Sequence, residues 1–126
     1  MAFIPEDAKW YLADIVQEFQ IEDEASSLVW INLILIRADS PEEAYERSLE
    51  EGNSHNSTYL NTDGKRVSSV FRGLRNLYVI IDKLEHGSEL IYEEKDDLNE
   101  EQVQKLLRSK SELSVFTPRD TSNDPL

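Results

Sequence analysis

The chain has 126 residues, with 26 acidic and 13 basic side chains and a net charge of −13, a size typical of one domain. It contains no cysteine, which excludes disulfides, zinc–thiolate centres, iron–sulfur clusters and a thiol nucleophile. The first residues do not form a secretory signal, and the most apolar stretch, 28–36, is too short to cross a bilayer. We therefore expect a cytoplasmic protein with no cofactor and no membrane contact.

The first half of the chain predicts two strands. Residues 1–8 are expected to form a lead-in, and residues 9–22 alternate between apolar and polar side chains, as in a half-buried strand. Residues 28–38 are apolar on both faces, which is typical of a central strand that is covered on both sides. Helices can supply one covering layer. The other must come from a second layer, a curled sheet or another subunit, which is a first indication of oligomerisation.

Two segments predict helices. Ser40-Pro41-Glu42-Glu43 has a capping serine, a proline at the first helical position and a glutamate that can close a capping box. The expected inward stripe of this helix comprises Ala44, Tyr45, Ser48 and Leu49, and Gly52 is expected to end it. The segment 99–102 predicts a second helix start by the same logic, and its apolar stripe comprises Val103, Leu106 and Leu107.

Between and after the helices the sequence predicts further strands. Asp63-Gly64 is typical of a tight hairpin turn, and its outgoing strand continues to Phe71. Gly73 is expected to interrupt that strand as a bulge or bend. Residues 77–82 and 89–94 are predicted to be further strands, and a short last strand is expected near 113–116.

This order of elements predicts an α+β fold, in which a mainly antiparallel sheet of about five strands carries two helices on one face. We expect one α+β domain over residues 9–116. Residues 117–126 are expected to form a disordered C-terminal tail, because they have nothing to bury.

Motifs for catalysis or metal binding are not found. The two histidines, His55 and His86, lie in predicted loops without partners at ligand spacing. The carboxylate runs lack the spacing of a calcium loop, and the four glycines form no phosphate-binding loop. A GxSxG nucleophile motif is missing as well, although a serine placed by the fold alone stays open. We therefore assign no catalytic residue and no metal ligand, and we do not expect an enzyme.

Four basic residues lie close together without an acid among them, and we call them the basic island: Lys65, Arg66, Arg72 and Arg75. In one interpretation they pair with acids of the same molecule or of a second copy. In another they bind a phosphate, a carboxylate or an acidic partner through guanidinium groups. In a third, together with Phe71 and Tyr78, they form a platform for single-stranded nucleic acid.

We favour an interface, because arginine and aromatic residues are enriched there and the second strand adds Trp30. The expected partner is a second copy, first of all in a homodimer, or another protein. The alternative is a binder of a small anionic ligand or single-stranded nucleic acid through the basic island, and an enzyme ranks third. Nucleic acid ranks low because the acidic chain repels phosphates. A neutraliser of a basic toxin or regulator is a further option.

Several segments together resemble a known family: WYLADIVQEF, LVWINLILIRADSPEEAYERSLEEG, VFRGLRNLYVI and LEHGSELIYEE. In this order they are similar to the bacterial domain of unknown function family 4288, from about Trp10 to Phe116. The resemblance implies a small stand-alone domain in a bacterial cytoplasm, and it implies no activity and no catalytic residues. Phe71, Gly73 and Leu74 match the family's F-x-G-L segment and are interpreted as packing and bending residues.

Overall fold

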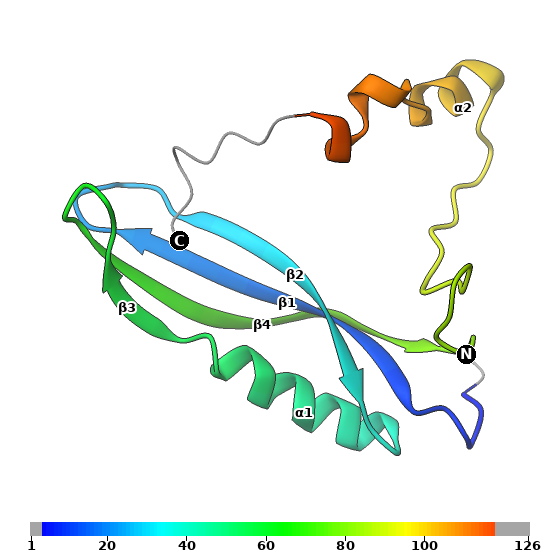
Figure 1. Ribbon diagram of the computed structural model, residues 1–126, viewed down its shortest axis with the longest axis horizontal. Helices are drawn as coiled ribbons and strands as arrows, with labels where there is room; N and C mark the ends of the chain where they lie inside the picture. Colours follow the sequence, from blue (N-terminus) through cyan, green and yellow to red (C-terminus); the bar gives the residue numbers. More distant parts are fainter. Residues whose placement is uncertain (1–3, 118–126) are drawn as a thin grey trace. The chain divides into compact units, whose positions relative to one another are not determined.

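The computed structural model describes residues 4–117, and the chain divides into two compact units between Ile91 and Tyr92. The first unit contains an antiparallel sheet with the strand order β2-β1-β4-β3 and a helix, α1, that packs against β4, β1 and β2 (Figure 1). The element bounds in this unit are β1 Trp10–Ile21, β2 Leu28–Arg37, α1 Pro41–Asn53, β3 Ser57–Leu60 and β4 Arg66–Ile80. The predicted α+β class is confirmed, with four strands in the sheet.

The position of β2 differs from the expectation of a central strand. β1 pairs with β2 on one side and with β4 on the other, so β2 forms an edge of the sheet. The cause is the path of the chain after β2. It passes through α1, and β4 then pairs with β1 on the side opposite to β2, so that no strand is added next to β2. The expectation of a central β2 was therefore wrong for a single copy of the chain.

The second half of the sheet has fewer strands than the sequence predicts. β4 continues for 15 residues through Gly73, so the segment 77–82 extends the same strand up to Ile80. A strand can bend at a bulge without ending. Residues 89–94 form no strand, and 3-10 turns at Lys110–Glu112 and Ser114–Phe116 replace the expected last strand. Both predictions were wrong because the apolar and polar side chains alternate over segments too short to distinguish a strand from an extended loop.

The start of α1 follows the predicted cap with one change. Ser40 Oγ accepts a hydrogen bond from the amide of Glu43 at 3.1 Å. Glu43 Oε1 accepts from the amide of Asp39 at 3.0 Å, so the reciprocal bond reaches one residue further back than a capping box does. Of the expected inward stripe, Ala44 and Ser48 are buried and Leu49 is half-buried, whereas Tyr45 is exposed.

The helix packs on a core that is centred on β1. Buried side chains from β1, the end of β2 and α1 form it: Tyr11, Ala13, Ile15, Ile36, Ala38 and Ala44. Gly52 lies inside α1 instead of ending it, because the ring of Phe71 occupies the place of a side chain there. A Cβ at position 52 would lie 2.4 Å from Phe71 Cε1. Glycine is therefore required for the close approach of α1 to β4.

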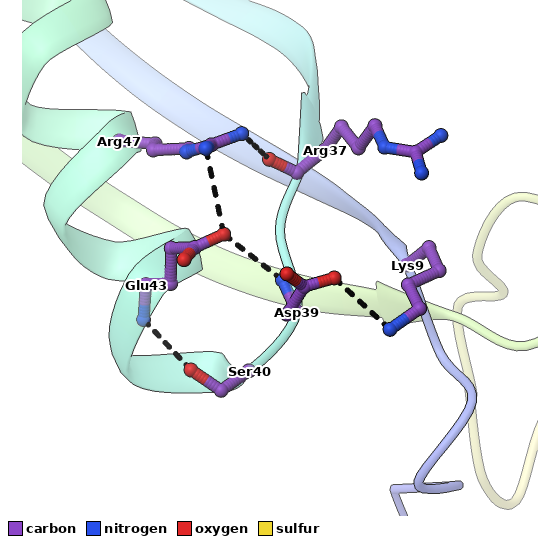
Figure 2. Close-up of polar contacts among 6 residues, drawn as sticks. All are labelled: Lys9, Arg37, Asp39, Ser40, Glu43 and Arg47. Carbon is purple, nitrogen blue, oxygen red and sulfur yellow. Dashed lines mark hydrogen bonds and ion pairs between the residues drawn. The ribbon is translucent and has the colours of Figure 1, made fainter.

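A polar network holds the junction between β2 and α1 (Figure 2). Arg47 donates from Nη1 to the carbonyl oxygen of Arg37 at 2.8 Å, and its Nη2 lies 3.6 Å from Glu43 Oε1. Lys9 Nζ donates to Asp39 Oδ1 at 2.9 Å. This hydrogen bond, together with the charge of Lys9, lowers the pKa of the Asp39 carboxyl.

The second unit begins at Tyr92 and contains α2, which spans Glu100–Leu106. The predicted cap is confirmed, since Asn99 and Gln102 exchange two hydrogen bonds of 2.9 Å. The helix ends at Leu106 and exposes its apolar stripe. Within residues 4–117 there is no helix long and apolar enough to span a membrane. The expected tail lies almost entirely outside the described residues.

Replacing Gly52 by alanine is expected to destabilise the fold. Overpacking against the Phe71 ring lowers the free energy of unfolding by about 1–3 kcal/mol, although alanine favours a helix by about 1 kcal/mol. Chemical denaturation measures the change. In a Phe71→Ala background the same Gly52→Ala substitution should instead be neutral or stabilising. A loss of stability of equal size in both backgrounds would contradict the proposed contact.

The Lys9–Asp39 pair is expected to make a pH-dependent contribution to stability. Because the Asp39 pKa is lowered in the folded state, the pair stabilises the fold above the pKa of an unfolded aspartate. Its contribution is lost as the pH falls through the folded pKa. In a Lys9→Gln variant the Asp39 pKa, measured by NMR titration, should return toward its ordinary value. An unchanged Asp39 titration would show that Lys9 is not the cause.

Candidate functional site

The face of β2 that points away from α1 carries a row of exposed aliphatic side chains. We call Val29, Ile31, Leu33 and Leu35 the outer row. Their exposed fractions are 52%, 39%, 54% and 45%, whereas Ile36, which lies on the α1 side of the strand, is 5% exposed. An apolar row of this kind at the edge of a sheet is a feature of interaction sites.

The outer row adjoins a mixed row on β1. Val29 pairs with Glu18, Ile31 with Val16, Leu33 with Asp14 and Leu35 with Leu12. Of these β1 residues Leu12 and Asp14 are buried, and Val16 and Glu18 are half-buried. The apolar surface on this face is therefore concentrated on β2, and charged side chains begin on the next strand.

Arg75 of the basic island is paired with one of these charged residues. Its Nε and Nη2 both lie 2.9 Å from Asp14 Oδ2. The Asp14 side chain is 1% exposed and the Arg75 side chain 55%, so the guanidinium covers the carboxylate. Asp14 Oδ1 is buried and has no hydrogen-bond partner among the described residues. Arg75 is thus the charge that compensates a buried carboxylate.

Arg72 makes a second and weaker pair on the same face. Its Nη1 lies 3.5 Å from Glu18 Oε1, and the exposed fractions are 62% for Arg72 and 24% for Glu18. Exposed pairs of this kind contribute little to stability, because solvent screens them and the long side chains lose entropy. Both contacts nevertheless join arginines of β4 to the β1 acids that lie next to the outer row.

A pair of bulges in β4 positions these arginines. The register between β1 and β4 shifts between Asp14 and Ile15 and again between Val16 and Gln17. Arg75 and Arg72 are the residues of β4 that have no partner on β1 at these shifts. Gly73 lies between them with φ +138°, a conformation that favours glycine. The predicted bulge is therefore present, and it consists of two separate shifts.

The remaining two members of the basic island lie elsewhere. Lys65 belongs to the turn before β4, where its amide donates to Asn61 Oδ1 at 3.0 Å. Arg66 is the first, exposed residue of β4 and pairs with Leu60 of β3. Within residues 4–117 neither side chain takes part in an ion pair. The fold thus separates the basic island into two arginines beside acids and two bases near the hairpin turn.

The aromatic candidates do not share one surface. Phe71 pairs with Gln17 on the α1 side of the sheet, where its ring packs on Gly52. Tyr78 pairs with Leu12 on the opposite face. Trp30 is half-buried and contacts Phe19 edge-on, with ring centroids 4.9 Å apart. A stacking platform that combines Phe71 and Tyr78 is therefore not formed.

The buried polar groups near α1 serve the fold. Gln17 Nε2 donates to Ser69 Oγ at 2.7 Å, and Ser69 Oγ donates to the carbonyl oxygen of His55 at 3.1 Å. The His55 ring faces Glu51, one helical turn earlier, at 3.8 Å. Across residues 4–117 no cluster of three or more histidine and carboxylate side chains could hold a metal ion. These contacts give no chemical arrangement for catalysis.

Sequence reasoning found the outer row and the arginines but missed their acidic partners. Asp14 and Glu18 are four residues apart on an alternating strand, and this spacing places both on the polar side of β1. The available signal was that an aspartate in the middle of a strand needs a compensating charge. The partner itself could not be predicted, because the bulges decide which arginine reaches which acid.

Comparison with known proteins gives a match to a protein family. Residues 10–92 match the model of a family described as "Domain of unknown function (DUF4288)". The matched region ends almost at the boundary between the two units. No curated protein and no solved structure is significantly similar to the chain.

The two arginine–acid pairs are expected to differ in their importance for stability. An Arg75→Gln substitution leaves the buried Asp14 carboxylate without its cation and should lower the free energy of unfolding by about 1–3 kcal/mol. The matched Arg72→Gln change should cost less than about 1 kcal/mol. Denaturant titration of both variants measures the difference, and equal effects would contradict the role assigned to Arg75.

Proposed function

The chain belongs to the DUF4288 family, a domain of unknown function, and we propose that it is a non-catalytic cytoplasmic module that self-associates through the outer row of β2. The observation that carries this proposal is the exposure of four consecutive outward-facing aliphatic side chains on one strand. Burial of such surface is the dominant favourable contribution to most protein–protein association.

The charge of the chain indicates where association can occur. At −13, two copies repel each other over most of their surfaces. Residues 25–36 contain no charged side chain, so a contact centred on β2 avoids close pairs of like charge. A second copy therefore fits this surface better than it fits the acidic remainder of the sequence.

The surroundings of the outer row also fit an interface. Protein–protein contacts combine an apolar centre with a polar rim, and arginine is enriched in them. Here the Arg75–Asp14 and Arg72–Glu18 pairs lie next to the outer row. We assign the two arginines to this rim, where they neutralise acids that would otherwise repel the second copy.

The alternative, a binder of anions or of single-stranded nucleic acid, has less support. A phosphate at Arg72 or Arg75 would have to compete with a carboxylate that is already in place. The aromatic residues needed for base stacking lie on opposite faces of the sheet. For these reasons we do not propose the anion-binding function.

Self-association should appear as a concentration-dependent mass. Light scattering is expected to give up to twice the chain mass of 14.6 kDa. A Leu33→Lys substitution should weaken dimerisation by at least about tenfold, since each copy loses an apolar contact and gains a buried charge. Added salt should strengthen the association of the unmodified protein, because it screens the repulsion between the two acidic copies.

The matched control is Leu60→Lys on β3, where the side chain is 70% exposed. This variant adds the same charge on the other edge of the sheet and should leave dimerisation unchanged. Leu33 is already 54% exposed, so its replacement should not unfold the monomer, as circular dichroism would verify. The proposal would be abandoned if the unmodified protein stayed monomeric at all concentrations.

A further inference from the structure

We infer that two copies of the chain pair edge to edge through β2, in an antiparallel arrangement about a twofold axis. The two sheets then form one continuous sheet of eight strands, four from each copy. This inference rests on the proposed self-association and adds its geometry: backbone hydrogen bonds between two β2 strands, with the outer rows of both copies side by side.

The first support is the open edge of β2. Its ten residues pair with β1 on one side, and within the first unit no strand pairs with the other side. Every second residue of such an edge strand directs its amide and carbonyl groups away from the sheet. These groups form a ready template for another strand.

The second support is that β2 lacks the features that normally protect an edge. It contains no proline or glycine, and it carries no charge before Arg37 at its end. Its ten residue pairs with β1 continue without a register shift. The opposite edge differs, because β3 has only four residues, and short edge strands resist pairing. The sequence of β2 therefore does not prevent pairing with other strands at this edge, as expected for an edge that is occupied by a partner strand.

The third support is the amino-acid pattern of β2. A strand that is apolar on both faces is typical of the middle of a sheet, and β2 takes a middle position only after pairing with a second copy. Adjacent strands lie about 4.8 Å apart, so the two outer rows would contact each other directly. An antiparallel pairing that keeps both outer rows on one face sets Leu33 of one copy opposite Ile31 of the other, and no like charges face each other.

Twofold symmetry also limits the assembly. An isologous contact uses the same edge of both copies, so pairing closes after two chains. The only edges left in the first units are then the two short β3 strands. Edge-to-edge pairing through β2 therefore gives a closed dimer, whereas pairing of β2 with β3 of the next copy would continue into a fibre.

Residue-resolved amide hydrogen exchange tests the inference. The unmodified full-length chain is measured by NMR at concentrations where light scattering gives the dimer mass, and again after dilution to the monomer. In the dimer, the alternate β2 amides that do not bond to β1 should exchange at least roughly tenfold more slowly than in the monomer. The amides on the free side of β3 serve as an internal control and should not change.

Each outcome separates the geometry from the self-association itself. A dimer in which only the β1-bonded amides of β2 are protected, as in the monomer, would overturn edge pairing and leave self-association through packed faces. A chain that stays monomeric would overturn both, and the open edge would then belong to a strand of another protein. In Leu33→Lys the protection of the outward amides should be lost, while Leu60→Lys should retain it.

Discussion

The strand β2 carries apolar side chains on both of its faces, whereas the helix of the first unit covers one of these faces. The core residues around Ile15 and Ala44 lie entirely on that covered side. The cap at Ser40, the Arg47 contact with the end of β2 and the close approach of Phe71 to Gly52 all hold α1 there. The core thus lies on the α1 side of the sheet, and the opposite side of β2 stays available for association.

On this open face, two members of the basic island compensate part of the acidity of the chain. A chain with twice as many acids as bases must limit repulsion wherever it forms a contact. Arg75 covers a buried aspartate and Arg72 contacts a half-buried glutamate on the strand next to the outer row. Two of the few cations are therefore used inside the molecule, at the place where uncompensated acids would most disfavour a second acidic copy.

Local sequence signals predicted most of the fold. The capping residues at Ser40 and Asn99 and the alternation in β1 depend on neighbours a few residues away, and the structure agrees with them. The edge position of β2 could not be predicted, because the direction of the chain after α1 is a property of the whole sheet. The exposed outer row followed from its apolar pattern, whereas the partners of Arg72 and Arg75 depend on register shifts that a single sequence does not reveal.

The two bulges of β4 explain why its inward-facing residues do not follow one unbroken alternation. Phe71 before the first shift, Leu74 between the shifts and Leu77 after the second all pair with β1 residues of the α1 side. Each bulge accommodates one extra residue without turning the rest of the strand over, so the inward face changes from odd to even residue numbers and back. A pattern search that assumed strict alternation along β4 would therefore assign Leu74 to the wrong face.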